Sequence, residues 1–210
     1  MDDDDVVAAL RRGDESTFRR VVTTYQPGLV RAARTFVRTD SVAEEVAQET
    51  WLAVIRGLDT FQERSSFKTW LFRILVNLAR TRGVRESRIT PFSSLVGDGG
   101  DHASSVGADR FEGDEGRWPC HWRAAPTDWG TLPEAVVTSA ETRQVIEDAI
   151  ASLPRNQREV ITLRDVEGFS SGEVCDVLEL SEGNQRVLLH RARSGVRSML
   201  ERHFEGVAAS

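Results

Sequence analysis

Apolar residues in the first half of the chain recur at the spacing of amphipathic helices. One helix is predicted by four of them at positions i, i+3, i+4 and i+7, with their side chains on its buried face: Trp51, Val54, Ile55 and Leu58. Ser41, followed by Glu44, predicts a capping box at the start of this helix. Gly57 lies near its expected end.

A second helix is predicted from about Phe67 to Gly83, with Gly83 as its C-cap. Its apolar residues make a continuous stripe: Phe67, Trp70, Leu71, Ile74, Leu75 and Leu78. Basic residues cluster from Arg64 to Arg88, where Glu86 is the single acid. A basic helix face of this kind is either solvated surface or a site for an anionic partner.

The last third of the chain predicts a series of shorter helices. One stops before Pro154, and the next ends at Gly168. Ser170 with Glu173 predicts a second capping box, and Ser181 is expected to cap the last helix. The expected buried seam of that helix has helical spacing: Leu189, Ala192, Val196 and Met199.

Residues 89–138 break this pattern, because they are rich in Gly, Ser and Asp and have neither helical nor strand periodicity. The sequence therefore predicts an all-α protein in which two small helical domains, residues 1–88 and 139–210, are joined by a long irregular linker. Acidic residues outnumber basic ones in this linker. It could imitate nucleic acid, be solvated and disordered, or order its tryptophans (Trp118, Trp122 and Trp129) against the two domains.

Composition narrows the class of protein. The 210 residues are 40% hydrophobic and 29% charged, as expected of a soluble globular chain. No apolar run is long enough to cross a membrane, and Asp2–Asp5 stand where a signal peptide would be basic, so we expect a cytoplasmic protein without membrane insertion. Cys120 and Cys175 lie far apart, and the four histidines form no triad, so we expect no metal site, no cofactor and no catalytic residues.

The chain near residues 170–197 has the pattern of a helix-turn-helix, in which the second helix enters the DNA major groove. That second helix is strongly basic although the whole chain has a formal net charge of -6. Its side chains could bind phosphates and base edges, or the helix could bind an acidic protein partner.

Two long segments resemble the extracytoplasmic-function (ECF) group of sigma-70 family factors. "AEEVAQETWLAVIRGLDTFQERSSFKTWLFRILVNLAR", residues 43–80, is similar to region 2 of that group. "SLPRNQREVITLRDVEGFSSGEVCDVLELSEGNQRVLLHRARSGVR", residues 152–197, is similar to region 4. The resemblance implies a factor that binds core RNA polymerase and promoter DNA, captures the opened -10 element with region 2 and reads the -35 duplex with region 4. It also implies an anti-sigma factor as a partner, although no segment marks its binding surface.

The resemblance assigns site residues by position. Polymerase binding is expected at three polar residues opposite Trp51, Leu52 and Ile55: Glu45, Gln48 and Glu49. The -10 strand is expected to contact Phe61, Arg64, Ser65, Ser66, Lys68, Arg73, Asn77 and Arg80. The -35 duplex is expected to contact Arg164, Ser171, Gly172, Asn184, Arg186, His190, Arg191 and Arg193.

The region 4 segment departs from the family pattern at five positions, two of which, Ser171 and Gly172, carry smaller residues than is typical. Gln185 takes a usually apolar position facing the seam, and Val187 with Leu188 replaces a polar pair on the outer side, where either could contact a thymine methyl group.

A stand-alone helix-turn-helix regulator is the alternative function, but the first half of the chain looks more like a second nucleic-acid module than a ligand pocket.

Overall fold

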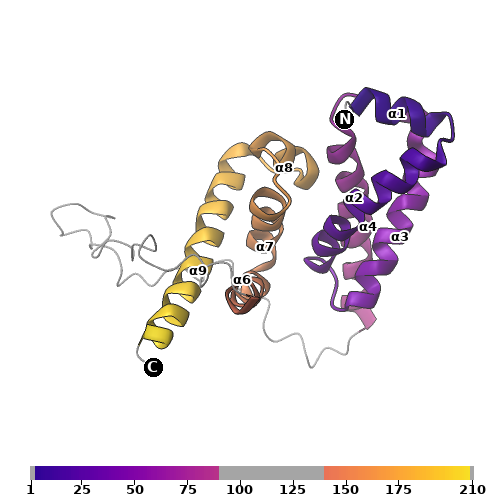
Figure 1. The fold of residues 1–210 in the computed structure, drawn as a ribbon. Helices are drawn as coiled ribbons and strands as arrows, with labels where there is room; N and C mark the ends of the chain where they lie inside the picture. Colours follow the sequence, from indigo (N-terminus) through magenta and orange to yellow (C-terminus); the bar gives the residue numbers. More distant parts are fainter. Residues whose placement is uncertain (1–2, 90–139, 209–210) are drawn as a thin grey trace. The chain divides into compact units, whose positions relative to one another are not determined.

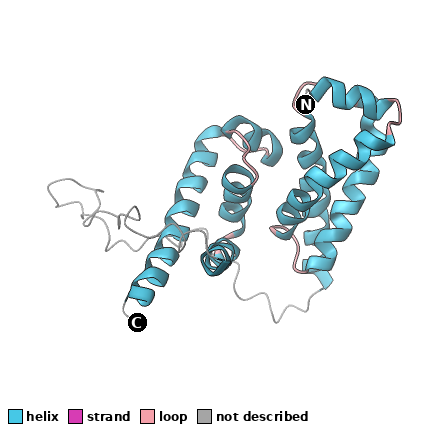
Figure 2. Cartoon of the chain, viewed as in Figure 1, coloured by secondary structure: helices cyan, strands magenta, loops and turns pink. Residues whose placement is uncertain are grey.

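The computed structural model describes residues 3–89 and 140–208, which form helices joined by short loops (Figure 1). They make two small helical domains, and no strand occurs in these two ranges (Figure 2). The expected all-α class is therefore confirmed. The expected linker falls almost wholly outside the described residues, as do its three tryptophans and Cys120. The domain limits of 1–88, 89–138 and 139–210 thus stay predictions.

The first domain is a bundle of three longer helices with a short helix at its N-terminal end (Figure 1). The elements are α1 (Asp3–Arg11), α2 (Glu15–Arg34), α3 (Asp40–Gly57), the 3-10 turn η1 (Leu58–Thr60) and α4 (Phe67–Ile89). Helices α2, α3 and α4 pack on one another, while α1 packs on α2 and η1. Leu29, Val46 and Leu75 bring one fully buried side chain from each long helix into the core, which is the main source of stability for such a bundle.

Side-chain caps fix where α2 and α3 begin. Asp14 caps α2, and hydrogen bonds from the Ser16 and Thr17 hydroxyls lower the pKa of its carboxyl to about 2. Thr39 caps α3, because its hydroxyl accepts a hydrogen bond from the Val42 amide at 3.3 Å. The predicted capping box at Ser41 is therefore wrong: Ser41 already lies inside the first turn of the helix.

Gly83 does not end its helix as predicted, since α4 continues to Ile89. A Cβ atom added at Gly83 would lie 2.5 Å from the Phe36 carbonyl oxygen. Glycine is required at this point because the backbone that follows α2 passes directly against α4.

The second domain consists of α6 (Ala140–Ser152), α7 (Arg155–Ile161), the π-helical turn η5 (Thr162–Val166), α8 (Ser171–Leu178) and α9 (Glu182–Ala208). Helix α6 stops before Pro154, as predicted. Gly168 follows η5 with a φ of +71°, a left-handed conformation that glycine adopts without strain, and this agrees with the predicted end of the helix. Both hydrogen bonds of the predicted Ser170–Glu173 capping box are present. Ser181 caps α9 as expected, accepting from the Asn184 amide at 3.3 Å.

Candidate nucleic-acid and polymerase interfaces

Helices α8 and α9 are joined by a tight turn, which is the geometry of a helix-turn-helix. Glu179 ends α8 in the left-handed conformation, with a φ of 59°, and α9 begins at Glu182. The Ser171 hydroxyl and the Gln185 Oε1 atom lie 2.9 Å apart, so a hydrogen bond from Ser171 joins the two helices. Gln185 is buried in the seam, as expected, and its Nε2 atom has no hydrogen-bond partner within the described ranges.

The exposed side of α9 carries a basic stripe made of four residues at spacings of four, three and four: Arg186, His190, Arg193 and Arg197. Such spacing keeps side chains on one face of a helix. Asn184 and Arg191 are exposed beside this stripe. All five expected -35 residues on α9 therefore lie on its accessible surface.

The three expected -35 residues that precede α9 are placed differently from one another. Arg164 is half-buried, and its Nη1 atom donates to the Phe169 carbonyl oxygen at 2.8 Å. The Ser171 hydroxyl is already used in its bond to Gln185. Gly172 is exposed but has no side chain to offer. Contacts from these residues to DNA would be fewer than from α9.

Val187 and Leu188 do not form an outward pair. Val187 is 48% exposed, as expected, but Leu188 is only 8% exposed, so its predicted outward position is wrong. Leu188 stands three residues after Gln185 and four before Ala192, both of which are buried, and it therefore shares their face.

The expected -10 residues before α4 lie in the 61–66 loop, which joins η1 to α4. Phe61 is only 7% exposed, and its ring stacks on that of Trp70 with 4.6 Å between centroids. Arg64 is exposed, whereas Ser65 and Ser66 are half-buried. The loop thus carries one exposed cation and two half-buried hydroxyls, and its first residue is held by an aromatic stack.

On α4 itself, Arg73, Asn77 and Arg80 fall at i, i+4 and i+7 and share one face of the helix. Arg73 and Asn77 are exposed, and Arg80 is half-buried, as is Lys68 in the first turn of α4. Phe67 is fully buried in the core, as the apolar stripe predicted.

The expected polymerase-binding residues Glu45, Gln48 and Glu49 are all exposed on α3, where Glu45 pairs with Arg82 of α4. Two apolar side chains join them: Leu52 is 53% exposed and Ile55 is 56% exposed. The predicted placement of these two on the opposite, buried side is wrong. Both share a helix face with Gln48, at i+4 and i+7.

The other three residues predicted on the buried side of α3 are placed correctly. Trp51, Val54 and Leu58 are 7%, 1% and 8% exposed. A hollow of about 320 Å³ lies beside Ile55, with walls from α1, α2, α3 and η1. The exposed face of α3 therefore combines acidic groups, apolar groups and a recess, which suits a protein partner.

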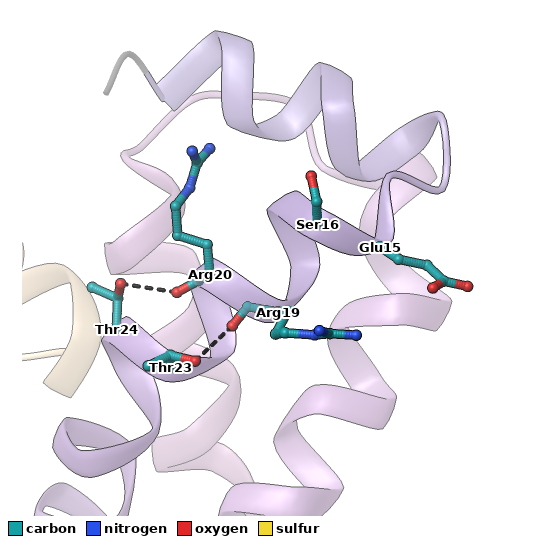
Figure 3. Close-up of a pocket in the computed structure, with 6 residues that line it drawn as sticks. All are labelled: Glu15, Ser16, Arg19, Arg20, Thr23 and Thr24. Carbon is teal, nitrogen blue, oxygen red and sulfur yellow. Dashed lines mark hydrogen bonds between the residues drawn. The ribbon is translucent and has the colours of Figure 1, made fainter.

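A second hollow, of about 560 Å³, lies along α2. The described residues that line it all belong to α2: Glu15, Ser16, Arg19, Arg20, Thr23 and Thr24 (Figure 3). The hydroxyls of Thr23 and Thr24 donate back to the Arg19 and Arg20 carbonyl oxygens, each at 2.9 Å. The two guanidinium groups point in different directions (Figure 3). Across residues 3–89 and 140–208, no cluster of His, Cys, Asp or Glu could hold a metal ion.

These features define a class of protein: a two-domain helical protein with a helix-turn-helix and a second basic surface suited to nucleic acid. Comparison with known families agrees. The profile of "Sigma-70 region 2" matches residues 21–89, and that of "Sigma-70, region 4" matches residues 143–194.

Relatives match along nearly the whole chain. The RNA polymerase sigma-H factor of Pseudomonas aeruginosa is 30% identical over 199 residues, which cover 95% of this chain and 94% of that protein. The ECF RNA polymerase sigma-E factor of Escherichia coli K12 is 29% identical over 201 residues, 93% of each chain.

Two solved structures share the fold. CnrH, in complex with the cytosolic domain of CnrY, aligns with a TM-score of 0.59 at 23% identity, covering 95% of this chain and 97% of that one. The sigma factor RpoE of Bartonella quintana, in complex with the anti-sigma factor NepR, aligns with a TM-score of 0.56 at 22% identity, covering 88% and 96%.

The chain belongs to the ECF group of the sigma-70 family of RNA polymerase sigma factors. Its function is that of a sigma factor, which joins core RNA polymerase and directs transcription initiation at promoters. None of the helices in the described ranges has the length and apolar character needed to cross a membrane.

Proposed function

We propose a division of labour among three surfaces of this sigma factor. The exposed face of α3 binds core RNA polymerase, the 61–66 loop with α4 binds one strand of the opened -10 element, and α9 reads the -35 duplex. The observation that carries the proposal is the basic stripe on α9, which is exposed and of which Arg186, His190 and Arg193 fall within the region 4 match.

Reading of the -35 element follows from the position of that stripe. Arginine offers a planar fork of donors that fits a guanine edge or a phosphate. His190 and Asn184 add polar contacts at the same surface. The capped N-terminus of α9 supplies backbone N–H groups and a favourable dipole for a phosphate.

Reading of the -10 element requires an unpaired strand, because only an unpaired base presents its Watson–Crick edge and its ring face. Asn77 can both donate to and accept from a base edge, while Arg64 and Arg73 can bind phosphates. Phe61, the first residue of the loop, is buried and stacks on Trp70, so its part is to support the loop rather than to stack on a base.

We further propose that an anti-sigma factor holds this protein inactive, on the ground that both related structures are complexes, one of them with a named anti-sigma factor. The protein would act in the cytoplasm, where its promoter DNA is, and would catalyse no reaction itself. Its chemistry would be binding alone.

The test compares promoter binding and run-off transcription by the full-length protein with and without core polymerase, at matched salt. Each domain offers only a few arginines, so the free protein should bind duplex DNA weakly. This affinity should fall further as the salt concentration rises. Core polymerase should hold both domains in place and convert two weak contacts into tight binding and initiation. Tight, sequence-specific binding by the free chain, without core-dependent initiation, would contradict the proposal.

A further inference from the structure

Helix α1 contacts both ends of the 61–66 loop, and this arrangement points to a role in promoter reading. The helix precedes the region 2 match, which begins at residue 21. Its first residue, Asp3, accepts a hydrogen bond from the Phe67 amide at 2.8 Å, where α4 begins. Its last residue, Arg11, reaches the other end of the loop.

Arg11 makes three separate contacts with its guanidinium group. Nη2 donates to the Phe61 carbonyl oxygen at 2.5 Å, and Nε donates to the Leu58 carbonyl oxygen at 3.4 Å. Nη1 pairs with the Glu63 carboxylate at 2.7 Å. Only arginine has donors in a fork wide enough to hold two carbonyl groups and a carboxylate at once.

Glu63 gives these contacts a specific purpose. Its φ is +56°, a left-handed conformation that residues with a Cβ atom rarely adopt. Such a conformation persists only where the surroundings hold it. The Arg11 contacts fall on Glu63 itself and on residues just before it, so they hold the chain in this turn.

Asp3 and Arg11 lie eight residues apart on one helix, about 12 Å along its axis. A rigid helix bound at both ends of a loop fixes the distance between those ends. We propose that α1, through Asp3 and Arg11, is a clasp that sets the conformation of the 61–66 loop and thereby the base preference at the -10 element. Asp3 and Arg11 are positioning residues in this role and do not touch DNA. The inference rests on the proposed function of the loop.

The first test uses full-length protein in complex with core polymerase and measures run-off transcription from promoters that carry each base at each -10 position. Arg11→Gln should reduce discrimination at the affected position by about fivefold or more, as a displaced base contact would, and Arg11→Lys should restore only part of it. Arg12→Gln is the matched control, because the Arg12 side chain makes no hydrogen bond to the described part of the loop. Preference at the -35 element should be unchanged in every variant.

A second pair of variants tests the loop even if Arg11→Gln folds poorly. Glu63→Gly and Glu63→Val remove the same carboxylate from an exposed position, but glycine accepts a positive φ and valine resists it. Glu63→Gly should keep most of the -10 discrimination, and Glu63→Val should lose it. Equal behaviour of these two variants would overturn the clasp.

Substitution of the reading surface itself separates the two proposals. Asn77→Ala and Arg64→Ala should change -10 preference if the loop and α4 read that element. If neither does, the proposed function of this surface is wrong. If both do while Arg11→Gln leaves discrimination intact, the reading surface stands and the clasp is wrong.

Discussion

At the scale of single residues, close packing makes some positions intolerant of one added methyl group. Gly83→Ala should destabilise the first domain by about 1 to 3 kcal/mol, because the new Cβ would lie 2.5 Å from the Phe36 carbonyl oxygen. The backbones of Gly83 and Phe36 are both packed within the domain, so neither has much freedom to move away from the other.

Gly183→Ala is the matched control, since a Cβ at that position in α9 meets nothing within 4 Å. Alanine in an open helix position should be neutral or stabilise by up to about 1 kcal/mol. Thermal unfolding followed by circular dichroism measures both. A stabilising Gly83→Ala would show that Phe36 does not lie against α4.

The chain has a single tyrosine, Tyr25, and its titration reports on Asp3. Burial raises the pKa of the Tyr25 phenol above its ordinary value of 10.0, and the negative charge of Asp3 raises it further. Asp3→Asn should therefore lower this pKa, though not to 10.0, because the burial remains. Phenolate absorbance measures the change, with Asp5→Asn as the control. An unchanged titration would mean that the Asp3 charge lies too far from Tyr25 to act on it.

At the scale of elements, the exposed face of α3 should bind polymerase through apolar as well as acidic contacts. Leu52→Ser with Ile55→Ser removes two side chains that are already more than half exposed, so the fold should survive. Core binding should weaken by about 1 to 3 kcal/mol if both are buried in the complex. Glu45→Arg with Glu49→Arg should weaken it as well.

A titration of labelled core polymerase measures both pairs of substitutions, and Arg19→Ser, at an exposed position on α2, is the control. The variant with Leu52→Ser and Ile55→Ser should have nearly the same melting temperature as the unsubstituted protein. If the affinity for core also stayed the same, the polymerase would have to bind elsewhere on the domain.

The basic stripe of α9 should act through both phosphates and bases. Arg186→Ala should cost about 1 to 3 kcal/mol at one -35 base pair if the guanidinium is bidentate to that base. If it binds a phosphate instead, binding should weaken equally on all sequences, and the slope of log affinity against log salt should fall by about one. Arg202→Ala, on the same helix beyond the region 4 match, should do neither. An unaffected -35 promoter would exclude Arg186 from the interface.

At the scale of the whole molecule, helical periodicity is enough to predict the all-α class and many core positions from α3 onward, but it gave no core position in α1 or α2, where Val7 and Leu29 are buried. The caps at Ser170 and Ser181 could be predicted because they depend on local geometry alone. The start of α3 was missed because Thr39 and Ser41 are both good caps, and only the backbone chooses between them.

What sequence could not provide was contact between distant segments. From the sequence alone, Gly83 fits the C-cap of a helix. In the structure it lies inside α4, where it leaves room for the Phe36 backbone. Ile55 fits the apolar period of α3, yet nothing in the described domain covers it. Arg11 gave no signal at all, because its partners lie 47 to 52 residues further along the chain. The periodic pattern shows which residues are apolar, but the partner that covers them is set by tertiary packing.

The stack of Phe61 on Trp70 has an optical consequence. Indole emission depends on nearby polarity and quenching groups, and the half-buried Trp70 ring stacks on Phe61, the first residue of the 61–66 loop. The chain has five tryptophans, so a variant that keeps Trp70 alone would carry a fluorophore next to the proposed base-binding surface. The arrival of an unpaired strand could then be followed in real time, without any dye attached to the protein or the DNA.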